Sequence, residues 1–306
     1  MTASDSPWRR FAAQWTPRIE STLADLIPTD RGSGRLHEAM RYVMFPGGKR
    51  LRPLLVLLGA QVAGGEPEKA LACAAALECL HTYRWVHDDL PCMDDDRLRR
   101  GRPTCHVRYD EATAVLVGDA LLTLAFAAVA TGGARAVTAL ARAAGSQGMV
   151  GGQQLDMEAQ GAMSATSSFA SLQVVEAIHD KKTGALITGS LEVGAITAQA
   201  DAALLARLRD YGNRIGRAFQ IADDCLDLTS TPEQLGKGTG QDAAAAKLTY
   251  PAVYGLERSL DVARKLAEEA AAMAAGICAL AGSPSTLDQN VRLLQDVASY
   301  TVGRQV

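Results

Sequence analysis

The chain has 306 residues, a formal net charge of −3 and a hydrophobic content of 48%. This balance of charges excludes the strongly basic surface that sequence-independent nucleic-acid binding requires, so we expect no nucleic-acid partner. The low aromatic content of 5% and the many alanine- and leucine-rich segments favour helices over strands.

Helical segments separated by proline and glycine account for most of the chain. We expect helices at residues 8–27, 35–45, 53–62, 68–86, 111–130, from after Gly133 to about 158, and at 169–198, 201–228, 251–281 and 286–302. The almost wholly apolar segment 111–130 is expected to be central in the core. Residues 161–168 and 230–247 are expected to form loops. No strand–glycine loop–helix unit and no repeat occurs, which predicts an all-α fold in one domain over residues 1–306.

Cysteine usage and apolar runs indicate the compartment. The six cysteines form no Cys-x-x-Cys pair, and we expect free thiols in a reducing environment. The N-terminus lacks an apolar stretch of the signal-peptide type. The longest apolar run, residues 120–130, is shorter than the roughly 20 residues that a membrane-spanning helix needs. We therefore expect a cytoplasmic protein without a membrane span.

The densest charge in the chain follows the helix predicted at 68–86. Five aspartates precede four arginines, namely Asp88, Asp89, Asp94, Asp95 and Asp96, then Arg97, Arg99, Arg100 and Arg102. Acidic side chains bind cations and arginines bind anions, so both together suit a phosphate or diphosphate that carries Mg²⁺. Pro91 interrupts the helix, so the loop after it can bring Asp94 back toward Asp88.

A second acidic group lies in the segment FQIADDCLDL. Asp223 and Asp227 are four residues apart and share one helix face, about 6 Å from each other, with Asp224 about 100° round the helix. Apolar neighbours indicate that the helix is partly buried, where three like charges repel one another unless a cation neutralises them. The alternative, a solvated acidic face, would need polar neighbours that this segment lacks. Two such groups predict metal ions held between two walls.

A rival hypothesis rests on two Glu-x-x-His motifs, Glu78 with His81 and Glu176 with His179. This pattern is typical of di-iron carboxylate bundles. The hypothesis leaves both aspartate groups and the arginines unexplained, and motifs of four residues arise easily by chance.

Six segments together carry a family resemblance. They are GGKRLRP (47–53), HDDLPCMDDDRLRRGRPTCH (87–106), GGQQLDM (151–157), KTGALI (182–187), FQIADDCLD (219–227), and GKGTGQD (236–242) followed by Lys247. In this order they resemble the trans-isoprenyl diphosphate synthases, above all bacterial short-chain members of the farnesyl diphosphate synthase (geranyltranstransferase) type. The resemblance implies antiparallel helices around a deep cavity, and a homodimer.

The resemblance also implies roles for individual residues. The aspartates that would hold three Mg²⁺ ions are Asp88, Asp89, Asp94, Asp223, Asp224 and Asp227. The contacts to the allylic diphosphate would be Arg99, Lys182, Thr183, Gln220, Lys237 and Lys247. Isopentenyl diphosphate would be bound by Lys49, Arg52, His81 and Arg100. The residues expected to be catalytic are Asp88, Asp89, Asp94, Arg99, Lys182 and Asp223.

The implied reaction joins isopentenyl diphosphate to dimethylallyl or geranyl diphosphate and releases diphosphate. Magnesium and cationic side chains would stabilise the leaving diphosphate, and apolar helices such as 111–130 would shield the carbocation from water. A terpene cyclase could share the metal motifs but has no need of the basic residues at 49–52. A non-catalytic subunit would be expected to lack some of the aspartates.

In this family the positions five and four residues before the first aspartate form the floor of the chain pocket. These positions are Tyr83 and Arg84. The aromatic Tyr83 favours a C15 product, farnesyl diphosphate, with geranylgeranyl or geranyl diphosphate as alternatives. Arg84 departs from the small or aliphatic residues that are usual there. Because a buried arginine needs a partner, we expect it to point into a helix interface.

Overall fold

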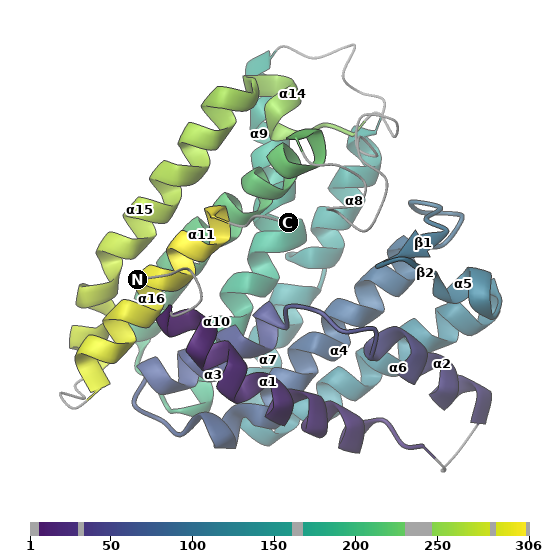
Figure 1. The fold of residues 1–306 in the computed structure, drawn as a ribbon, viewed down its shortest axis with the longest axis horizontal. Coiled ribbons are helices and arrows are strands. Elements are labelled where there is room, and N and C mark those ends of the chain that lie inside the picture. The colour runs from purple at the N-terminus through teal and green to yellow at the C-terminus, as the bar shows by residue number, and fades with distance from the viewer. Residues whose placement is uncertain (1–5, 30–33, 161–167, 230–246, 282–285, 304–306) are drawn as a thin grey trace.

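The computed structural model describes residues 6–29, 34–160, 168–229, 247–281 and 286–303 (Figure 1). These residues are almost entirely helical, which confirms the predicted all-α class. The first half contains α1 (Pro7–Leu26), α2 (Gly34–Met44), α3 (Leu51–Val62), η2 (Pro67–Ala70), α4 (Leu71–Asp88), β1 (Leu98–Arg99), β2 (Arg102–Pro103), α5 (Cys105–Arg108), α6 (Glu111–Val129) and η3 (Ala130–Gly132). The second half contains α7 (Gly133–Ala144), α8 (Met149–Ala159), α9 (Ser168–Ile178), η5 (His179–Gly184), α10 (Ala185–Thr197), α11 (Ala202–Thr229), α14 (Tyr250–Tyr254), α15 (Leu256–Ala281) and α16 (Leu287–Val302).

Helix α10 lies at the centre of the bundle, and its residues 186–196 are all buried. It packs against α3, α7 and α11, while α4 packs against α6, and α15 packs against α11 and α16. Figure 1 shows α15 and α16 along one side of the molecule, α4 and α6 toward the other, and α1 and α2 crossing the lower front. Buried apolar side chains from α1 through α16 form one large core cluster. The single domain over residues 1–306 stays a prediction.

The helix α6 is less buried than its sequence predicts. Apolar residues such as Leu116, which is 56% exposed, lie on its outer face, and no α6 residue lines the cavity described below. The opposite face, which includes Val117, Leu121 and Ala125, belongs to the core. The expectation that α6 is central therefore holds for one face only, because hydropathy does not distinguish a core from an interface. Its role in shielding a carbocation stays a prediction. Within the helical stretch Glu111–Ala159, the most apolar window of 18 residues has a mean hydropathy of 2.0, and 39% of that window is buried. By length and composition it could span a membrane, a test that a core helix of a soluble protein also passes.

Two predicted helices are interrupted. The segment 169–198 contains the π-helical turn η5 between α9 and α10, and Gly255, with φ +83°, separates α14 from α15. Residues 98–103 form a two-stranded hairpin, absent from the predicted elements, in which Arg99 pairs with Arg102. Its turn consists of Arg100 and Gly101, both with positive φ, which is the conformation that tight hairpins prefer. Strands of two residues are too short to show alternation in a sequence.

The six cysteines are free, as expected. Five of them are buried and Cys92 is exposed. The expected loops at 161–168 and 230–247 lie outside the described residues, apart from Ser168, which begins α9, and Lys247.

Candidate active site

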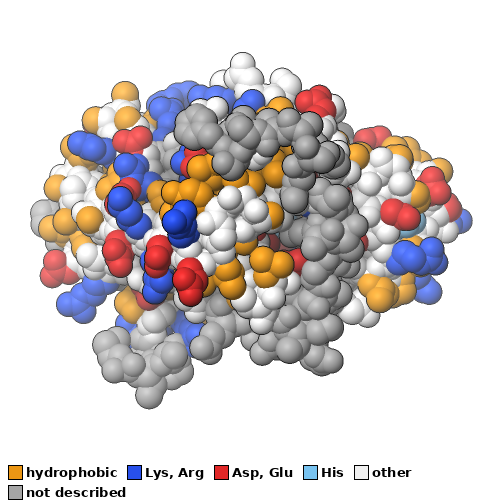
Figure 2. Space-filling model, turned by 90° about the horizontal axis from the view of Figure 1, so that it is seen from above, with side chains coloured by type: hydrophobic (Ala, Val, Ile, Leu, Met, Phe, Trp, Pro, Cys, Tyr) orange, Lys and Arg blue, Asp and Glu red, His pale blue; other side chains and the backbone are white. Residues whose placement is uncertain are grey.

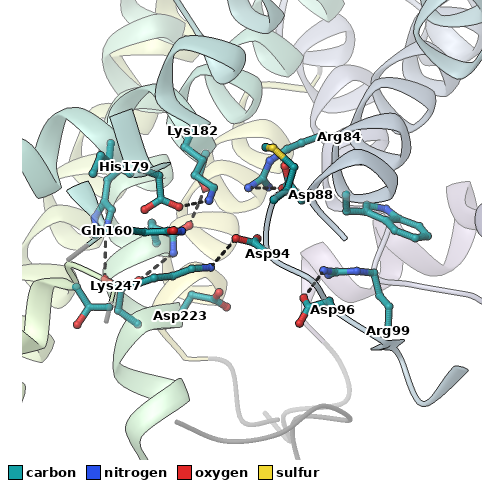
Figure 3. Close-up of a pocket in the computed structure, with 18 of the residues that line it drawn as sticks. Arg84, Asp88, Asp94, Asp96, Arg99, Gln160, His179, Lys182, Asp223 and Lys247 are labelled. Carbon is teal, nitrogen blue, oxygen red and sulfur yellow. Dashed lines mark hydrogen bonds and ion pairs between the residues drawn. The ribbon is translucent and has the colours of Figure 1, made fainter. Parts of the chain in front are cut away.

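A cavity of about 680 Å³ lies at one end of the helical bundle. Residues of α4 and the following loop form one wall, and residues of α8, η5 and α11 form the other (Figure 3). Asp88, Asp94 and Asp96 face it from the first wall, and Asp223 and Asp224 from the second. Figure 2 looks down on this end of the molecule and shows acidic and basic side chains interspersed on the described surface. The structure therefore brings the two acidic groups to one hollow, although more than 120 residues separate them in the sequence.

Most of the predicted site residues line this cavity. These are His81, Arg84, Asp88, Asp94, Arg99, Arg100, Lys182, Thr183, Gln220, Asp223, Asp224 and Lys247. The predicted residues that do not line it are Lys49, Arg52, Tyr83, Asp89 and Asp227. Lys237 lies outside the described residues.

The break at Pro91 shapes the first wall. Helix α4 ends at Asp88, and the chain folds back so that the N–H of Asp94 donates to the carbonyl of Asp88 at 2.8 Å. The N–H of Asp95 donates to the carbonyl of Leu90, and Asp95 has φ +52°. The predicted return of Asp94 toward Asp88 is therefore confirmed.

Each aspartate predicted for the first metal-binding motif has a cationic partner. Asp88 forms an ion pair with Arg84 at 3.0 Å, and Asp94 forms one across the cavity with Lys247 at 3.4 Å. Asp89 is fully buried behind the wall and binds Arg99 at 2.6 Å. Burial raises the pKa of Asp89 to about 7, although the Arg99 guanidinium opposes this shift. In this structure the buried Asp89 orients Arg99 from behind the cavity wall.

Asp223 and Asp224, neighbours on α11, have different surroundings. Asp223 is exposed and faces the cavity. Asp224 is buried and accepts hydrogen bonds from the Gln220 side chain at 2.9 Å and from the N–H of Tyr250 at 3.0 Å, and its carboxylate lies 3.1 Å from His179. Burial alone would raise the pKa of Asp224, but these partners stabilise the carboxylate and lower it.

Lys182 and Thr183 reach the cavity from the π-helical turn η5. Gly152 of α8 permits a close approach, because a Cβ atom there would lie 2.2 Å from the backbone nitrogen of Lys182. The Lys182 ammonium forms an ion pair with Asp156, and burial, followed by the charge of Arg84, lowers its pKa. The hydroxyl of Thr183 donates to the Gln220 side chain at 2.6 Å, which continues the network to Asp224.

Residues without a predicted role in the site also line the cavity. They include Asp96, Asp156, Gln160 and His179. Asp156 belongs to the segment GGQQLDM, one of the six that carry the family resemblance, so the sequence did offer a signal that it belongs to the site. His179 was named only in the di-iron hypothesis. No local sequence pattern indicates that Gln160 belongs to the site.

The residues expected to bind isopentenyl diphosphate gather around the start of α3. His81 and Arg100 line the cavity, and the Arg100 guanidinium donates to the carbonyl of Gly47. Arg52 is buried, whereas Lys49 is exposed. Burial, followed by the charge of Arg52, lowers the pKa of His81 well below its ordinary value, so His81 is neutral. We call Lys49, Arg52, His81 and Arg100 the second anion seat.

Tyr83 and Arg84 differ in position. Tyr83 packs edge-on against His87 with ring centroids 5.3 Å apart, outside the cavity lining. Arg84 lines the cavity beside Asp88, so the expectation that it points into a helix interface is wrong. The carboxylate of Asp88, one turn further along α4, supplies the partner that a buried arginine needs.

The di-iron hypothesis does not fit this geometry. Glu78 forms a buried ion pair with Arg50 at 2.5 Å, and Glu176 accepts a hydrogen bond from Tyr250 at 3.4 Å. Within the described residues, no group of three or more histidine, cysteine, aspartate or glutamate side chains could hold a metal ion.

The lack of such a group among the described residues is compatible with magnesium. Magnesium keeps several waters and usually binds through one or two carboxylates together with substrate phosphates, so a three-carboxylate cage is not required. In the described structure, both carboxylate oxygens of Asp227 are buried without a hydrogen-bond partner. These oxygens and the exposed Asp223 fit a divalent cation that arrives together with a diphosphate.

An all-helical bundle with two aspartate walls and basic residues around one cavity has the architecture of an isoprenoid synthase. The chain belongs to the polyprenyl synthetase family, whose model matches residues 33–276. It is a prenyltransferase that elongates prenyl chains.

Curated relatives are similar over most of the chain. The heterodimeric geranylgeranyl pyrophosphate synthase large subunit 1 (chloroplastic) of Arabidopsis thaliana is 43% identical over 82% of this chain and 70% of its own length. The geranylgeranyl diphosphate synthase of Cyanophora paradoxa is 42% identical over 82% of this chain and 85% of its own length. Both relatives are named for the synthesis of geranylgeranyl diphosphate.

Solved structures share the fold. An FPP/GFPP synthase from Zymomonas mobilis has 36% identity and a TM-score of 0.77, over 95% of this chain and 98% of that one. A geranyltransferase from Helicobacter pylori, complexed with magnesium and isoprenyl diphosphate, has 31% identity and a TM-score of 0.80, over 97% of this chain and 98% of that one.

Proposed function

We propose that this prenyltransferase condenses isopentenyl diphosphate with an allylic diphosphate in a Mg²⁺-dependent reaction whose main product is geranylgeranyl diphosphate. The observation that carries the proposal is that Asp88 and Asp94 face Asp223 across one cavity that also contains Lys182 and Lys247. Support for the C20 product comes from the curated relatives. Farnesyl diphosphate is the second candidate, supported by the similarity to the FPP/GFPP synthase.

The residues of the cavity can stabilise the charge that develops on the leaving diphosphate. Arg99, Lys182 and Lys247 are cations that the fold already directs into the cavity, so little reorganisation is needed when the allylic C–O bond breaks. Bound magnesium, three ions by family expectation, would add positive charge at the diphosphate oxygens, held by Asp88, Asp94 and Asp223 with Asp227 nearby.

The second anion seat would hold isopentenyl diphosphate beside the allylic diphosphate. Arg52 and Arg100 supply fixed positive charge, and neutral His81 can donate a hydrogen bond without adding a charge next to the developing carbocation. This placement directs the isopentenyl double bond toward the allylic carbon. The proton lost after attack would leave to the released diphosphate.

Arg84 is the residue that limits the product length in this proposal. Its guanidinium lies in the cavity one helical turn from Asp88, where an isoprenyl chain that enters past the aspartate would meet a charge. An apolar chain desolvates this guanidinium at a cost, so Arg84 disfavours further elongation.

A second copy of the chain would cover the exposed apolar face of α6. Val115 and Leu116 are 41% and 56% exposed, and an apolar helix face of this kind is typical of subunit interfaces. A homodimer formed through α6 is therefore part of the proposal, as is the cytoplasmic location that the sequence predicts.

Product analysis tests this proposal. The purified protein is incubated with isopentenyl diphosphate, Mg²⁺ and a C5, C10 or C15 allylic diphosphate, and the products are identified by mass. We expect elongation in all three reactions with C20 as the final product. Accumulation of C15 would favour the farnesyl candidate, and the lack of any condensation product would contradict the proposal.

A further inference from the structure

Arg50 lies in the sequence between Lys49 and Arg52, two of the residues expected to bind isopentenyl diphosphate, yet its side chain is buried away from the cavity. It is 3% exposed and does not line the cavity. Its Nε donates to Glu20 at 2.6 Å, one terminal nitrogen donates to Glu78 at 2.5 Å, and the other donates to the carbonyl of Met44 at 2.8 Å. All three guanidinium nitrogens are therefore used within the protein.

The three partners of Arg50 belong to three different helices. Glu20 lies in α1, Met44 ends α2 and Glu78 lies in α4, while Arg50 itself immediately precedes α3. The guanidinium thus connects the beginning of α3 to three neighbouring helices. A planar arginine donates to three acceptors from three separate nitrogens in fixed directions, whereas a lysine ammonium donates from one nitrogen only.

The backbone at this point adopts a conformation that non-glycine residues rarely take. Arg50 has φ +45°, in the left-handed region, and its carbonyl accepts the N–H of Leu54 in the first turn of α3. At this turn the neighbouring side chains point in different directions: Lys49 is exposed, whereas Arg50 is buried. Such strain persists only where surrounding contacts hold it, and the contacts here are those of the guanidinium.

These contacts determine where the second anion seat is formed. Glu78 lies one helical turn before His81 in α4, and Arg50 lies two residues before Arg52 at the start of α3. The ion pair between Arg50 and Glu78 therefore fixes α4 relative to the start of α3. Arg52 and His81 are close enough for the charge of Arg52 to act on the imidazole. The carbonyl of Gly47, in the same turn, accepts a hydrogen bond from Arg100.

We propose that Arg50 is a positioning residue for isopentenyl diphosphate. Through Glu78 and Glu20 it holds the second anion seat in the geometry that binds the diphosphate, without touching the substrate itself. This inference rests on the proposed function, because it assumes that the seat takes the isopentenyl substrate. A residue with only a structural role would affect the allylic and isopentenyl substrates equally.

The test compares Michaelis constants for the two substrates in Glu78→Gln and Arg50→Lys. Glu78→Gln keeps the size of the side chain and removes its charge, whereas Arg50→Lys keeps the charge and removes two of the three donor nitrogens, so both weaken the buried pair. We expect the KM for isopentenyl diphosphate to rise about tenfold, while the KM for the allylic substrate and kcat change by less than about twofold. An unchanged KM for isopentenyl diphosphate in a folded variant, or an equal rise in both constants, would overturn the proposal.

Glu192→Gln is the matched control. Glu192 is also buried and binds two arginines, Arg142 and Arg209, both at 2.6 Å or less, but it lies outside the cavity lining. The Glu192→Gln substitution should lower the midpoint of thermal unfolding without changing the KM for either substrate. If Glu78→Gln and Arg50→Lys do not fold, Glu20→Gln provides the test, because the Glu20 side chain is 33% exposed. We expect it to raise the isopentenyl KM alone, and no rise would contradict the inference.

Failure of the proposed function gives a different result from failure of this inference. If the wild-type protein condenses no allylic diphosphate with isopentenyl diphosphate, the proposed function fails and the role of Arg50 fails with it. If the wild type is active but the variants keep the wild-type KM for isopentenyl diphosphate, only the positioning role is wrong.

Discussion

Asp94 and Lys247 form an ion pair of 3.4 Å that spans the cavity. Asp94 belongs to the loop after α4, and Lys247 lies just before α14, so the pair connects the first wall with the segment that leads into α14 (Figure 3). Each side chain partly neutralises the other. A diphosphate with its metal ions would compete for both, since Asp94 can bind the cation and Lys247 the anion.

Replacing Lys247 with methionine should weaken binding of the allylic substrate. The substitution retains much of the apolar stem but removes the charge that faces the diphosphate. We expect kcat/KM for the allylic substrate to fall by roughly 10²-fold, as is typical for the loss of one charged contact at a developing anion. Lys265→Met on α15, whose side chain is exposed, is the control and should retain wild-type kinetics.

Replacing Asp88 or Asp223 with alanine should remove most turnover and leave the fold intact. Each carboxylate faces the cavity, and its loss removes a magnesium ligand. We expect kcat to fall by about 10²–10³-fold or more. Asp261→Ala, at a surface carboxylate that is 71% exposed, should retain activity. Unchanged turnover in either cavity variant would count against the proposed scheme.

Replacing Arg84 with serine should lengthen the products. The guanidinium that an elongating chain would meet is removed, and mass analysis should show a larger share of the longest product. Tyr83→Ala tests the position that the sequence favoured. Because Tyr83 packs against His87 and does not line the cavity, we expect a smaller change than for Arg84→Ser. A larger change in Tyr83→Ala would show that Tyr83 forms the floor.

The stability of the protein should fall in mild acid partly because of His81. Burial and Arg52 lower its pKa in the folded state, so below pH 6.5 the unfolded chain binds a proton that the folded protein does not. The contribution lowers the unfolding free energy by up to about 1.4 kcal/mol for each pH unit below 6.5. Urea denaturation at pH 7 and pH 5.5 should show a smaller loss for His81→Gln than for the wild type. Equal losses would contradict a neutral His81.

Replacing Leu116 with glutamate should disrupt a dimer formed through α6. A charge on this exposed apolar face would be buried without a partner in the interface. Light scattering should show the wild type as a dimer and the variant shifted toward monomer. Leu280→Glu, at another exposed leucine, should remain dimeric.

Much of the fold was predictable because helices have a strong period and clear breakers. Pro91 and the aspartate spacing were sufficient to predict the return of Asp94 toward Asp88. The burial of α6 was not predictable, since an apolar helix suits a core and an interface equally well. The position of η5 was also not predictable, because a π-helical turn depends on how closely α8 and α11 approach it.

For the site, the sequence identified the residue types but not their partners. Asp88, Asp89 and Asp94 look equivalent in the motif, yet Asp89 is buried against Arg99 while the other two face the cavity. Arg50 looks like a third basic residue of the second anion seat, but its left-handed backbone directs it inward to Glu78. Such differences follow from tertiary contacts, which no local pattern contains.

The central claim is that carboxylates from both walls hold one magnesium–diphosphate unit. Calorimetric titration of inorganic pyrophosphate in the presence of Mg²⁺ tests it most directly, with the wild type, Asp88→Ala, Asp223→Ala and the control Asp261→Ala. We predict that the wild type and the control bind pyrophosphate only with Mg²⁺, and that either cavity substitution weakens binding at least tenfold, by about 1.4 kcal/mol or more. Wild-type affinity in Asp88→Ala or in Asp223→Ala would contradict the claim.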